Sequence, residues 1–416
     1  MTTPFIIDDR ELGSFKVNRR VFTDPEILRQ ERVKVFDRTW IYAAHESELK
    51  ASGAFCSRTV AGRPVIVVRG DDGNVRVFLN TCTHRGVPVC RTASGCAPTF
   101  RCPYHGWTFS NQGRLIGLPQ ADAYSDAFNR DDLALASPPR VEIYRGFIFI
   151  SFNPDIEPLV EYLKDAKDYL DLVCDQSESG MEVIAGTHFY CTRANWKLVI
   201  ENNIDLYHVA TVHKRYFDYA IGAGGDSNTL RRTGRGIDLH NGHAAVESTP
   251  PAGGRLVAHW GPPFPESMRS DIELRRRRIE ERFGRERADQ MTQYNRNLIL
   301  FPNLIINDAI SVVIRSSFPI SEDYVEITAW ALAGADESAE DRRMRIDSFL
   351  TFLGPGGFGT PDDTELLESC QRAFANKEVV WSDVSKGAKR EHPRHDDELQ
   401  IRAFWRRWNE LMTGGE

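Results

Sequence analysis

The chain has 416 residues, of which 41% are hydrophobic and 27% charged, and it carries a formal net charge of −7. This composition is typical of a soluble globular protein with two or three domains. The acidic balance argues against a general affinity for nucleic acid or an anionic membrane, because both need a cationic surface. The N-terminus has acids where a secretory signal has bases, and no apolar stretch approaches the ~20 residues that span a bilayer, so we expect a cytoplasmic protein.

The first predicted element is a helix. Residues 24–38, DPEILRQERVKVFDR, form a charged amphipathic pattern that opens after Asp24, with Pro25 in its first turn. Residues 40–153 then contain short alternating or β-branched runs, such as RPVIVVRG and RGFIFISF, separated by Gly- and Pro-rich turns. These runs predict a compact antiparallel β domain.

The rest of the chain mixes helical and strand patterns. Helices are predicted for residues 155–175, 194–213, 337–352 and 362–377, and successive strands for residues 296–332. Together they predict an α+β domain built on an antiparallel sheet.

The segment 220–290 is rich in glycine and arginine. Its run ELRRRRIEERFGRER is interpreted as a solvated helix face with ion pairs between residues four apart. Its glycines and its position suggest a lid over the metal site described below, and its role is otherwise open.

Two loops, CTH and CPYH, each pair one cysteine with one histidine. The four residues are Cys82, His84, Cys102 and His105. Two sulfurs and two imidazoles can hold one tetrahedral zinc, or they can divide between the irons of a [2Fe–2S] cluster. A zinc finger usually draws both cysteines from one turn, whereas here each loop supplies one residue of each kind, which favours the cluster. Cys90 and Cys96 are expected to be ordinary thiols, because their use would leave a histidine without a role.

A second group of possible ligands lies in ANWKLVIENNIDLYHVATVH, at residues 194–213. Asp205 and His208 are three residues apart and are therefore expected on one helix face, whereas His213 does not fit a straight stripe and suggests a widened or broken turn. Two imidazoles and a carboxylate that leave positions open form the facial triad of mononuclear iron(II) oxygenases. By proximity alone, Asp205 could be the carboxylate.

The pattern C-x-H, seventeen residues, C-x-x-H-G-W resembles the Rieske domain of the Rieske non-haem iron ring-hydroxylating oxygenases, and the resemblance extends over nearly the whole chain. It implies that the two loops hold a Rieske [2Fe–2S] cluster. The resemblance also covers the motif E-N-x-x-D-x-Y-H-x-x-x-x-H, in which it implies that His208 and His213 bind a mononuclear iron(II). It makes Asp205 a bridge to a Rieske-domain histidine of a neighbouring subunit, and Asn202 of the same motif is a candidate substrate contact.

The resemblance places the third iron ligand in a later Gly-rich turn followed by two acids. Here that turn is LGPGGFGTPDDTELLE at residues 353–368, where the match implies Asp363, with Asp362 as the alternative. The same turn satisfies G-x-G-x-x-G, the dinucleotide fingerprint. The two acids would repel a pyrophosphate, so we expect no nicotinamide site. Reducing equivalents are expected from a separate NAD(P)H-dependent reductase, directly or through a ferredoxin.

One residue, Arg315, indicates the chemical class of the substrate. In AISVVIRSSFPI, strand alternation places Arg315 on one face with Ser311, Val313 and Ser317, and a cation on a buried face requires an anionic partner. That partner could be an internal acid, or it could be a substrate carboxylate, for which the planar guanidinium is well suited. Some family members that act on aromatic acids carry an arginine at what looks like the matching position, so the resemblance favours an aromatic carboxylate. Arg402 is a second candidate.

The sequence therefore predicts the large, oxygenase subunit of a Rieske non-haem iron dioxygenase that uses O2 to convert an aromatic compound to a cis-dihydrodiol. The expected parts are an N-terminal helical segment at 1–38 that packs on the catalytic domain, a Rieske domain at 39–154, and a catalytic domain at 155–416 with a helix-grip type of antiparallel sheet flanked by helices. By resemblance the protein is a homotrimer, or an α3β3 assembly with a small β subunit.

Three alternatives stay open at this point. Related enzymes use the same metals for monohydroxylation or demethylation. A Rieske electron carrier would have no chemistry of its own, but it would leave the long region after the Rieske domain unexplained. The third alternative is a zinc-stabilised binding protein, which would be colourless, whereas an iron–sulfur protein would be brown and contain acid-labile sulfide.

Overall fold

The computed structural model describes residues 3–222, 233–249, 254–261 and 264–414. The chain divides into two compact units. One unit is Phe36–Glu161, and the other combines Met1–Val35 with Tyr162–Glu416.

The unit Phe36–Glu161 is built from small antiparallel sheets, as predicted for the β-rich region. The strands are β3 (Ile41–His45), β4 (Ala54–Val60), β5 (Arg63–Arg69), β6 (Val75–Leu79), β7 (Ser94–Cys96), β8 (Thr99–Arg101), β9 (Thr108–Ser110), β10 (Leu115–Gly117), β11 (Arg140–Tyr144) and β12 (Phe147–Ser151). They pair in the orders β11-β12-β3, β6-β5-β4-β7 and β10-β9-β8. β-Branched runs such as Val65–Val68 are fully buried, which explains why this region reads as strands.

The second unit contains an eight-stranded antiparallel sheet, which confirms the predicted α+β class. Its strands are β13 (Met181–Val183), β14 (His188–Thr192), β15 (Gly234–Asp238), β16 (Ala244–Ser248), β17 (Asn295–Leu300), β18 (Leu304–Asp308), β19 (Val312–Ser321) and β20 (Tyr324–Gly334). The order is β13-β20-β19-β18-β17-β16-β15, and β14 also pairs with β20. Strands β17 to β20, the last four of this sheet in chain order, are those predicted for residues 296–332. A separate small sheet joins β1 (Ile6–Asp9), β2 (Ser14–Asn18) and β21 (Trp381–Asp383).

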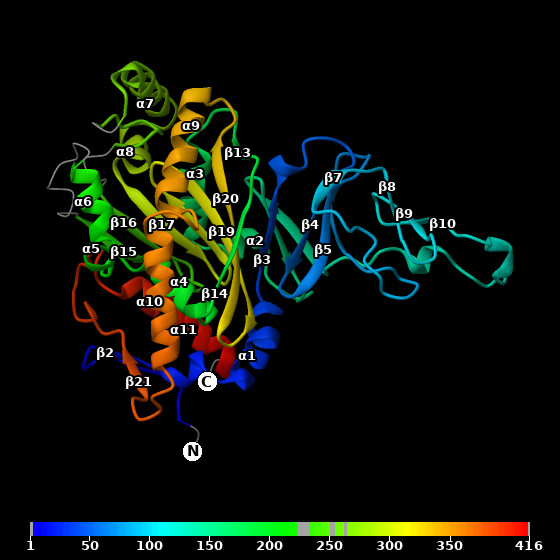
Figure 1. Ribbon diagram of the computed structural model, residues 1–416, viewed down its shortest axis with the longest axis horizontal. Helices are drawn as coiled ribbons and strands as arrows, with labels where there is room; N and C mark the ends of the chain where they lie inside the picture. The colour runs from blue at the N-terminus through cyan, green and yellow to red at the C-terminus, as the bar shows by residue number, and fades with distance from the viewer. Residues whose placement is uncertain (1–2, 223–232, 250–253, 262–263, 415–416) are drawn as a thin grey trace. The chain divides into compact units, whose positions relative to one another are not determined.

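Several helices flank this sheet (Figure 1). The helices of this unit are α1 (Pro25–Glu31), α3 (Ala166–Cys174), α4 (Trp196–Ile204), α5 (Val209–Val212), α6 (Lys214–Gly222), α7 (Arg269–Phe283), α8 (Arg285–Gln293), α9 (Ala339–Ser348), α10 (Gly359–Ala373) and α11 (Leu399–Thr413), and α2 (Leu159–Tyr162) spans the boundary between the two units in the sequence. Helix α4 packs on β16, β17 and β19, α9 packs on β20, and α11 packs on β15 and β16. None of the helices in the described ranges is both long and apolar enough to cross a membrane.

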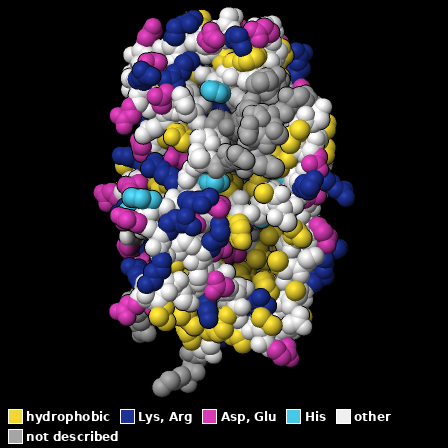
Figure 2. Space-filling model, turned by 90° about the vertical axis from the view of Figure 1, so that its left-hand side faces the viewer, with side chains coloured by type: hydrophobic (Ala, Val, Ile, Leu, Met, Phe, Trp, Pro, Cys, Tyr) yellow, Lys and Arg dark blue, Asp and Glu magenta, His cyan; other side chains and the backbone are white. Residues whose placement is uncertain are grey.

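The segment 220–290 contributes to this unit in several ways. The lid was predicted for this segment. Part of it lies outside the described residues, namely residues 223–232, 250–253 and 262–263. The described part supplies strands β15 and β16 and helices α7 and α8. The arginine run forms a helix with ion pairs at the predicted spacing, such as Arg276 with Glu280 at 3.4 Å. On the face in Figure 2, acidic and basic side chains are likewise interspersed, and hydrophobic side chains gather in a hollow in the lower half.

A buried ion pair fixes helix α4 to the N-terminal helix α1. Lys197 Nζ lies 2.6 Å from Glu31 Oε1, and both side chains are 0% exposed. The indoles of Trp196 and Trp408 donate to the two oxygens of Glu31, each at 2.8 Å. The carboxylate is therefore fully used by partners from α4 and α11, and α1 is held against both helices.

We predict that Lys197→Met destabilises the protein by about 3–5 kcal/mol, because Glu31 would keep a buried charge without its counter-ion. The free energy of unfolding, measured by urea denaturation followed by tryptophan fluorescence, checks this. The double variant Glu31→Gln with Lys197→Met should lose less than the single variant, because neither charge remains. Additive losses in the double variant would contradict this account.

Candidate active site

The two cysteine–histidine loops have the same backbone conformation. In each loop a glycine donates its N–H to the cysteine carbonyl four residues earlier, Gly86 to Cys82 at 2.8 Å and Gly106 to Cys102 at 3.0 Å. Both glycines have positive φ, +81° and +75°, a conformation that strains any residue with a side chain. Each cysteine N–H also donates to the carbonyl five residues later. The sequence repeat therefore builds two equivalent turns.

These turns present two thiols and two imidazoles. Cys82 and Cys102 are buried and close enough for their thiols to interact, and the ring centroids of His84 and His105 are 4.6 Å apart. Burial raises the pKa of the Cys82 thiol, and Cys102 raises it further. Burial and His105 lower the pKa of His84, which favours the neutral imidazole that a metal requires. His84 also stacks on Trp107, with 4.8 Å between ring centroids.

The four side chains do not converge on a single point. Among the described residues, the group of possible ligand atoms that all lie within 4.8 Å of one another is His208, His213 and Asp363. A tetrahedral zinc needs ligand atoms at about 2.0–2.3 Å from one ion, and hence close to one another. The loops therefore suit two adjacent irons better than one zinc. Cys90 and Cys96 instead donate their thiols to backbone carbonyls, at 3.4 Å and 3.3 Å.

The helix predicted around the second group is interrupted. Helix α4 ends before Asp205, and α5 is a single turn that begins after His208. The two residues therefore lie in the link between two helices, and the expectation that they share a helix face is wrong. The link is stabilised by the Asp205 carboxylate, which accepts the N–H of Tyr207 at 2.6 Å. His213 directly follows α5, so the two histidines flank one short turn.

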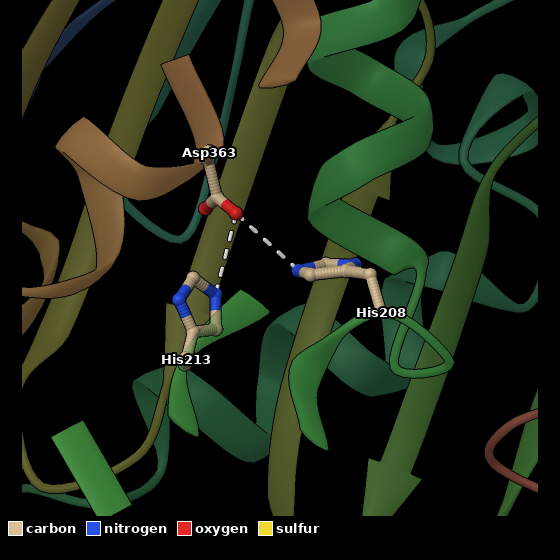
Figure 3. A group of neighbouring side chains, drawn as sticks. All are labelled: His208, His213 and Asp363. Atoms are coloured by element: carbon tan, nitrogen blue, oxygen red, sulfur yellow. Dashed lines mark ion pairs between the residues drawn. The ribbon is translucent and has the colours of Figure 1, made fainter. Parts of the chain in front are cut away.

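Three side chains from two distant segments converge here (Figure 3). Asp363, near the start of α10, places Oδ1 3.4 Å from His208 Nε2 and 3.3 Å from His213 Nε2. Asp362, the alternative from the sequence, lies 4.0 Å from the other ring nitrogen of His213. The geometry therefore brings Asp363 between the two histidines and leaves Asp362 beside them.

Two carboxylates act on His208. Asp205 Oδ2 lies 3.2 Å from its Nδ1, so one ring nitrogen faces Asp205 and the other faces Asp363. Burial lowers the pKa of His208, but the two carboxylates outweigh this effect and raise the pKa to about 9. Burial raises the pKa of Asp363, but His208 and His213 hold it well below its usual range. A carboxylate behind an imidazole is the arrangement that orients metal-bound histidines.

A cavity of about 160 Å³ opens beside these residues. Its lining includes Asn202, Asn203, Asn297, Asn307, Arg315 and Phe352. One part is aromatic: the ring of Phe352 lies 4.5 Å from that of Tyr216 and 5.3 Å from that of His213. Asn202, predicted to contact substrate, lines the cavity with its Nδ2 3.5 Å from His208 Nε2. The cavity thus combines an apolar wall with a few polar groups, as small-molecule sites do.

Arg315 is held by amides. Its side chain is buried, and Nη2 donates to Asn203 Oδ1 at 2.6 Å and to Asn307 Oδ1 at 2.7 Å. Among the described residues, no acid pairs with Arg315, so they do not supply the internal salt bridge that the sequence left open. Arg402, the second candidate, donates to the backbone carbonyls of Val384 and Lys386 and is absent from the described cavity lining.

Sequence reasoning missed Asn203, Asn297 and Asn307. The two strand residues, Asn297 and Asn307, are paired in the register of β17 and β18 and stand on the same face as Arg315. Polar side chains on the buried face of otherwise apolar strands were the available signal.

The comparisons with known proteins agree with this geometry. A family model described as Rieske [2Fe-2S] domain matches residues 39–139, and one described as ring hydroxylating alpha subunit (catalytic domain) matches residues 161–414. The chain is 36% identical over 391 residues to the 2-halobenzoate 1,2-dioxygenase large subunit of Burkholderia cepacia, covering 92% of this chain and 82% of that protein. It is 35% identical over 399 residues to the toluate 1,2-dioxygenase subunit alpha of Pseudomonas putida, covering 92% and 84%. The crystal structure of naphthalene 1,2-dioxygenase from Rhodococcus sp. bound to indole superposes with a TM-score of 0.84 at 28% identity, covering 95% and 94%.

The chain therefore belongs to the alpha subunits of the ring-hydroxylating oxygenases. It is an oxidoreductase with a Rieske [2Fe–2S] domain and a catalytic domain that binds mononuclear iron, as the resemblance implied. The match at 161–414 excludes an electron carrier that lacks a catalytic domain, and the match at 39–139 excludes a zinc-stabilised binding protein.

Glu201 lies in α4, one turn before Asp205, and its ionisation makes the stability of this region depend on pH. Burial raises the pKa of Glu201 to about 8, although the Trp405 indole that donates to its carboxyl opposes the shift. The folded-state pKa thus lies above the ordinary value of 4.5. Stability from this group is therefore full at low pH and is lost as the pH rises from about 4.5 toward 8.

We predict that Glu201→Gln removes this loss, because the amide oxygen can still accept the indole N–H and carries no charge. The Tm of the variant relative to the wild type should rise between pH 5 and pH 8. A Tm difference that stays constant over this range would contradict the prediction.

Proposed function

We propose that this chain is the oxygenase subunit of a multicomponent dioxygenase that converts an aromatic carboxylate to a cis-dihydrodiol. The observation that carries the proposal is the Arg315 cation, which lines the cavity beside His208, His213 and Asp363 and has no acidic partner among the described residues. The names of two relatives, 2-halobenzoate and toluate dioxygenase, denote aromatic acids, which supports the same substrate class.

We assign the metal ligands as follows. Cys82 and Cys102 would bind one iron of the cluster, and His84 and His105 the other. The mononuclear iron would be held by His208, His213 and Asp363, whose donor atoms match a facial triad with open positions. When bound, this iron activates dioxygen with electrons that the cluster delivers one at a time.

The protein's own part is to bind and orient the substrate. A buried guanidinium without an anionic partner is costly, and a substrate carboxylate would remove that cost. The aromatic wall at Phe352 and Tyr216 would pack on the substrate ring. Fixing the carboxylate at Arg315 restricts which ring carbons can lie near the three iron ligands, and this sets the position of attack.

The electrons and the assembly need further components. We assign the electron supply to an NAD(P)H-dependent reductase, directly or through a ferredoxin. The relatives are named large subunit and subunit alpha, which supports a larger assembly, a homotrimer or an α3β3 complex with a small β subunit. Asp205 would connect sites across such an assembly, because its side chain is partly exposed while one oxygen contacts His208.

Asp363→Asn should release the mononuclear iron, because an amide is a weaker ligand than a carboxylate. Iron analysis of the purified variant should show this loss, while acid-labile sulfide and the visible spectrum of the cluster stay unchanged. Asp362→Asn, which makes the same change one residue earlier, should retain the iron. Equal iron loss in both variants would contradict the assignment of Asp363.

A single turnover of the reduced, iron-loaded protein with isotopically labelled O2 tests the function. Aromatic acids and neutral arenes should be compared, and two labelled oxygens in an aromatic acid are expected. A single labelled oxygen would indicate monooxygenation instead. Arg315→Gln should lower kcat/KM for the acid roughly 10- to 150-fold, the value of a hydrogen bond to a charged group, and affect neutral arenes less. Labelled product from neutral arenes alone would refute the carboxylate assignment.

A further inference from the structure

The buried arginines on the two faces of this sheet have different partners. On the side of β18 opposite Asn307, Asp308 Oδ1 lies 2.5 Å from Arg255 Nη2, and its Oδ2 lies 3.2 Å from Arg296 Nη1, although Arg296 also borders the cavity. Arg296 Nε also lies 2.9 Å from Glu247 Oε1. These side chains are at most 6% exposed. Arg255 and Arg296 are therefore neutralised by buried acids, whereas the buried Arg402 is bonded to backbone carbonyls.

On the cavity face, the buried arginine is bonded to side-chain amides and not to acids. Asn307 directly precedes Asp308 in β18, so its side chain points to the opposite face. There it accepts from Arg315 Nη2, as does Asn203 from helix α4. Arg315 is also buried, at 9% exposed against 0% for Arg255 and 2% for Arg296, yet its partners carry no formal charge. The guanidinium is held but not neutralised.

Further hydrogen bonds fix these amides with their oxygens toward Arg315. Asn307 Nδ2 donates to Asn203 Oδ1 and to Asn297 Oδ1, both at 2.9 Å. Asn297 Nδ2 in turn donates to the Asn203 carbonyl at 2.8 Å. Arg315 Nε is buried without an acceptor among the described residues, and both bonds described for the guanidinium use Nη2. The guanidinium therefore keeps donors that the described residues do not use.

We propose that Asn203 and Asn307 are specificity-determining residues: their uncharged oxygens position the Arg315 guanidinium and leave its charge for a carboxylate ligand. This inference rests on the proposed function. An acid at either position would neutralise Arg315 from inside the protein, and the substrate carboxylate would then meet a repelling anion instead of a free cation. The preference for anionic over neutral substrates would disappear.

Asn203→Asp tests this with little change of shape. The Oδ1 atom keeps both bonds that it accepts, and the Nδ2 atom that is replaced is buried without a partner among the described residues. Asn307→Asp is the second variant, in case the first does not fold. Asn295→Asp is the matched control, because it adds the same charge to the cavity lining at a side chain without a described bond to Arg315.

The measurement is the dissociation constant, by calorimetry without O2, of benzoate, 2-chlorobenzoate and 4-methylbenzoate and of the three corresponding amides. In Asn203→Asp the acids should bind roughly tenfold or more weakly, while the amides change little. The control should lose less of its preference for acids. An unchanged acid-to-amide ratio in both asparagine variants, or an equal loss in the control, would overturn the inference. If the wild type itself shows no preference for acids, the proposed function fails, and this result is distinct from the failure of the asparagines alone.

Discussion

The position of helix α4 is the constraint on which the catalytic site depends. At its start, Lys197 forms the buried ion pair with Glu31, and Trp196 donates to the same carboxylate. At its end, Asn203 is bonded to the asparagines of the sheet and to Arg315. Because both ends are fixed, the link that follows α4 has a defined direction. That link carries Asp205 and His208.

The interruption of the helix after α4 determines where the His208 and His213 side chains point. A continuous helix would turn His208 and His213 to different sides, since they are five residues apart. The one-turn helix between them instead allows both Nε2 atoms to approach Asp363. The same break leaves Asp205 behind His208, on the ring nitrogen that does not face Asp363. One local interruption therefore positions both the proposed metal ligands and the carboxylate that contacts one of them.

Charge is distributed unequally around the cavity. The proposed iron ligands include one carboxylate, Asp363, and the Arg315 cation lies in the same cavity lining. Asp308 offsets the nearby Arg255 and Arg296, whereas the partners of Arg315 carry no formal charge. The arrangement favours a ligand that has an anionic group attached to an aromatic ring.

Much of this could be predicted from the sequence, because the signals were local. The paired cysteine–histidine loops, the strands at 296–332 and the apolar setting of Arg315 all depend on residues close in the chain. The shared helix face of Asp205 and His208 was a wrong prediction, because the Asp205 carboxylate accepts a nearby backbone N–H and so competes with the helix. The partners of Arg315 could not be predicted, because Asn203 lies 112 residues away in the chain and is brought there only by the packing of α4 on the sheet.

The most direct test of the central claim is a crystal structure of the iron-loaded protein with benzoate, prepared without O2. The account predicts a carboxylate oxygen within about 3 Å of Arg315 Nη1 or Nε, with the ring directed toward His208, His213 and Asp363. A benzoate whose carboxylate lies away from Arg315, or one bound to the iron in its place, would contradict it.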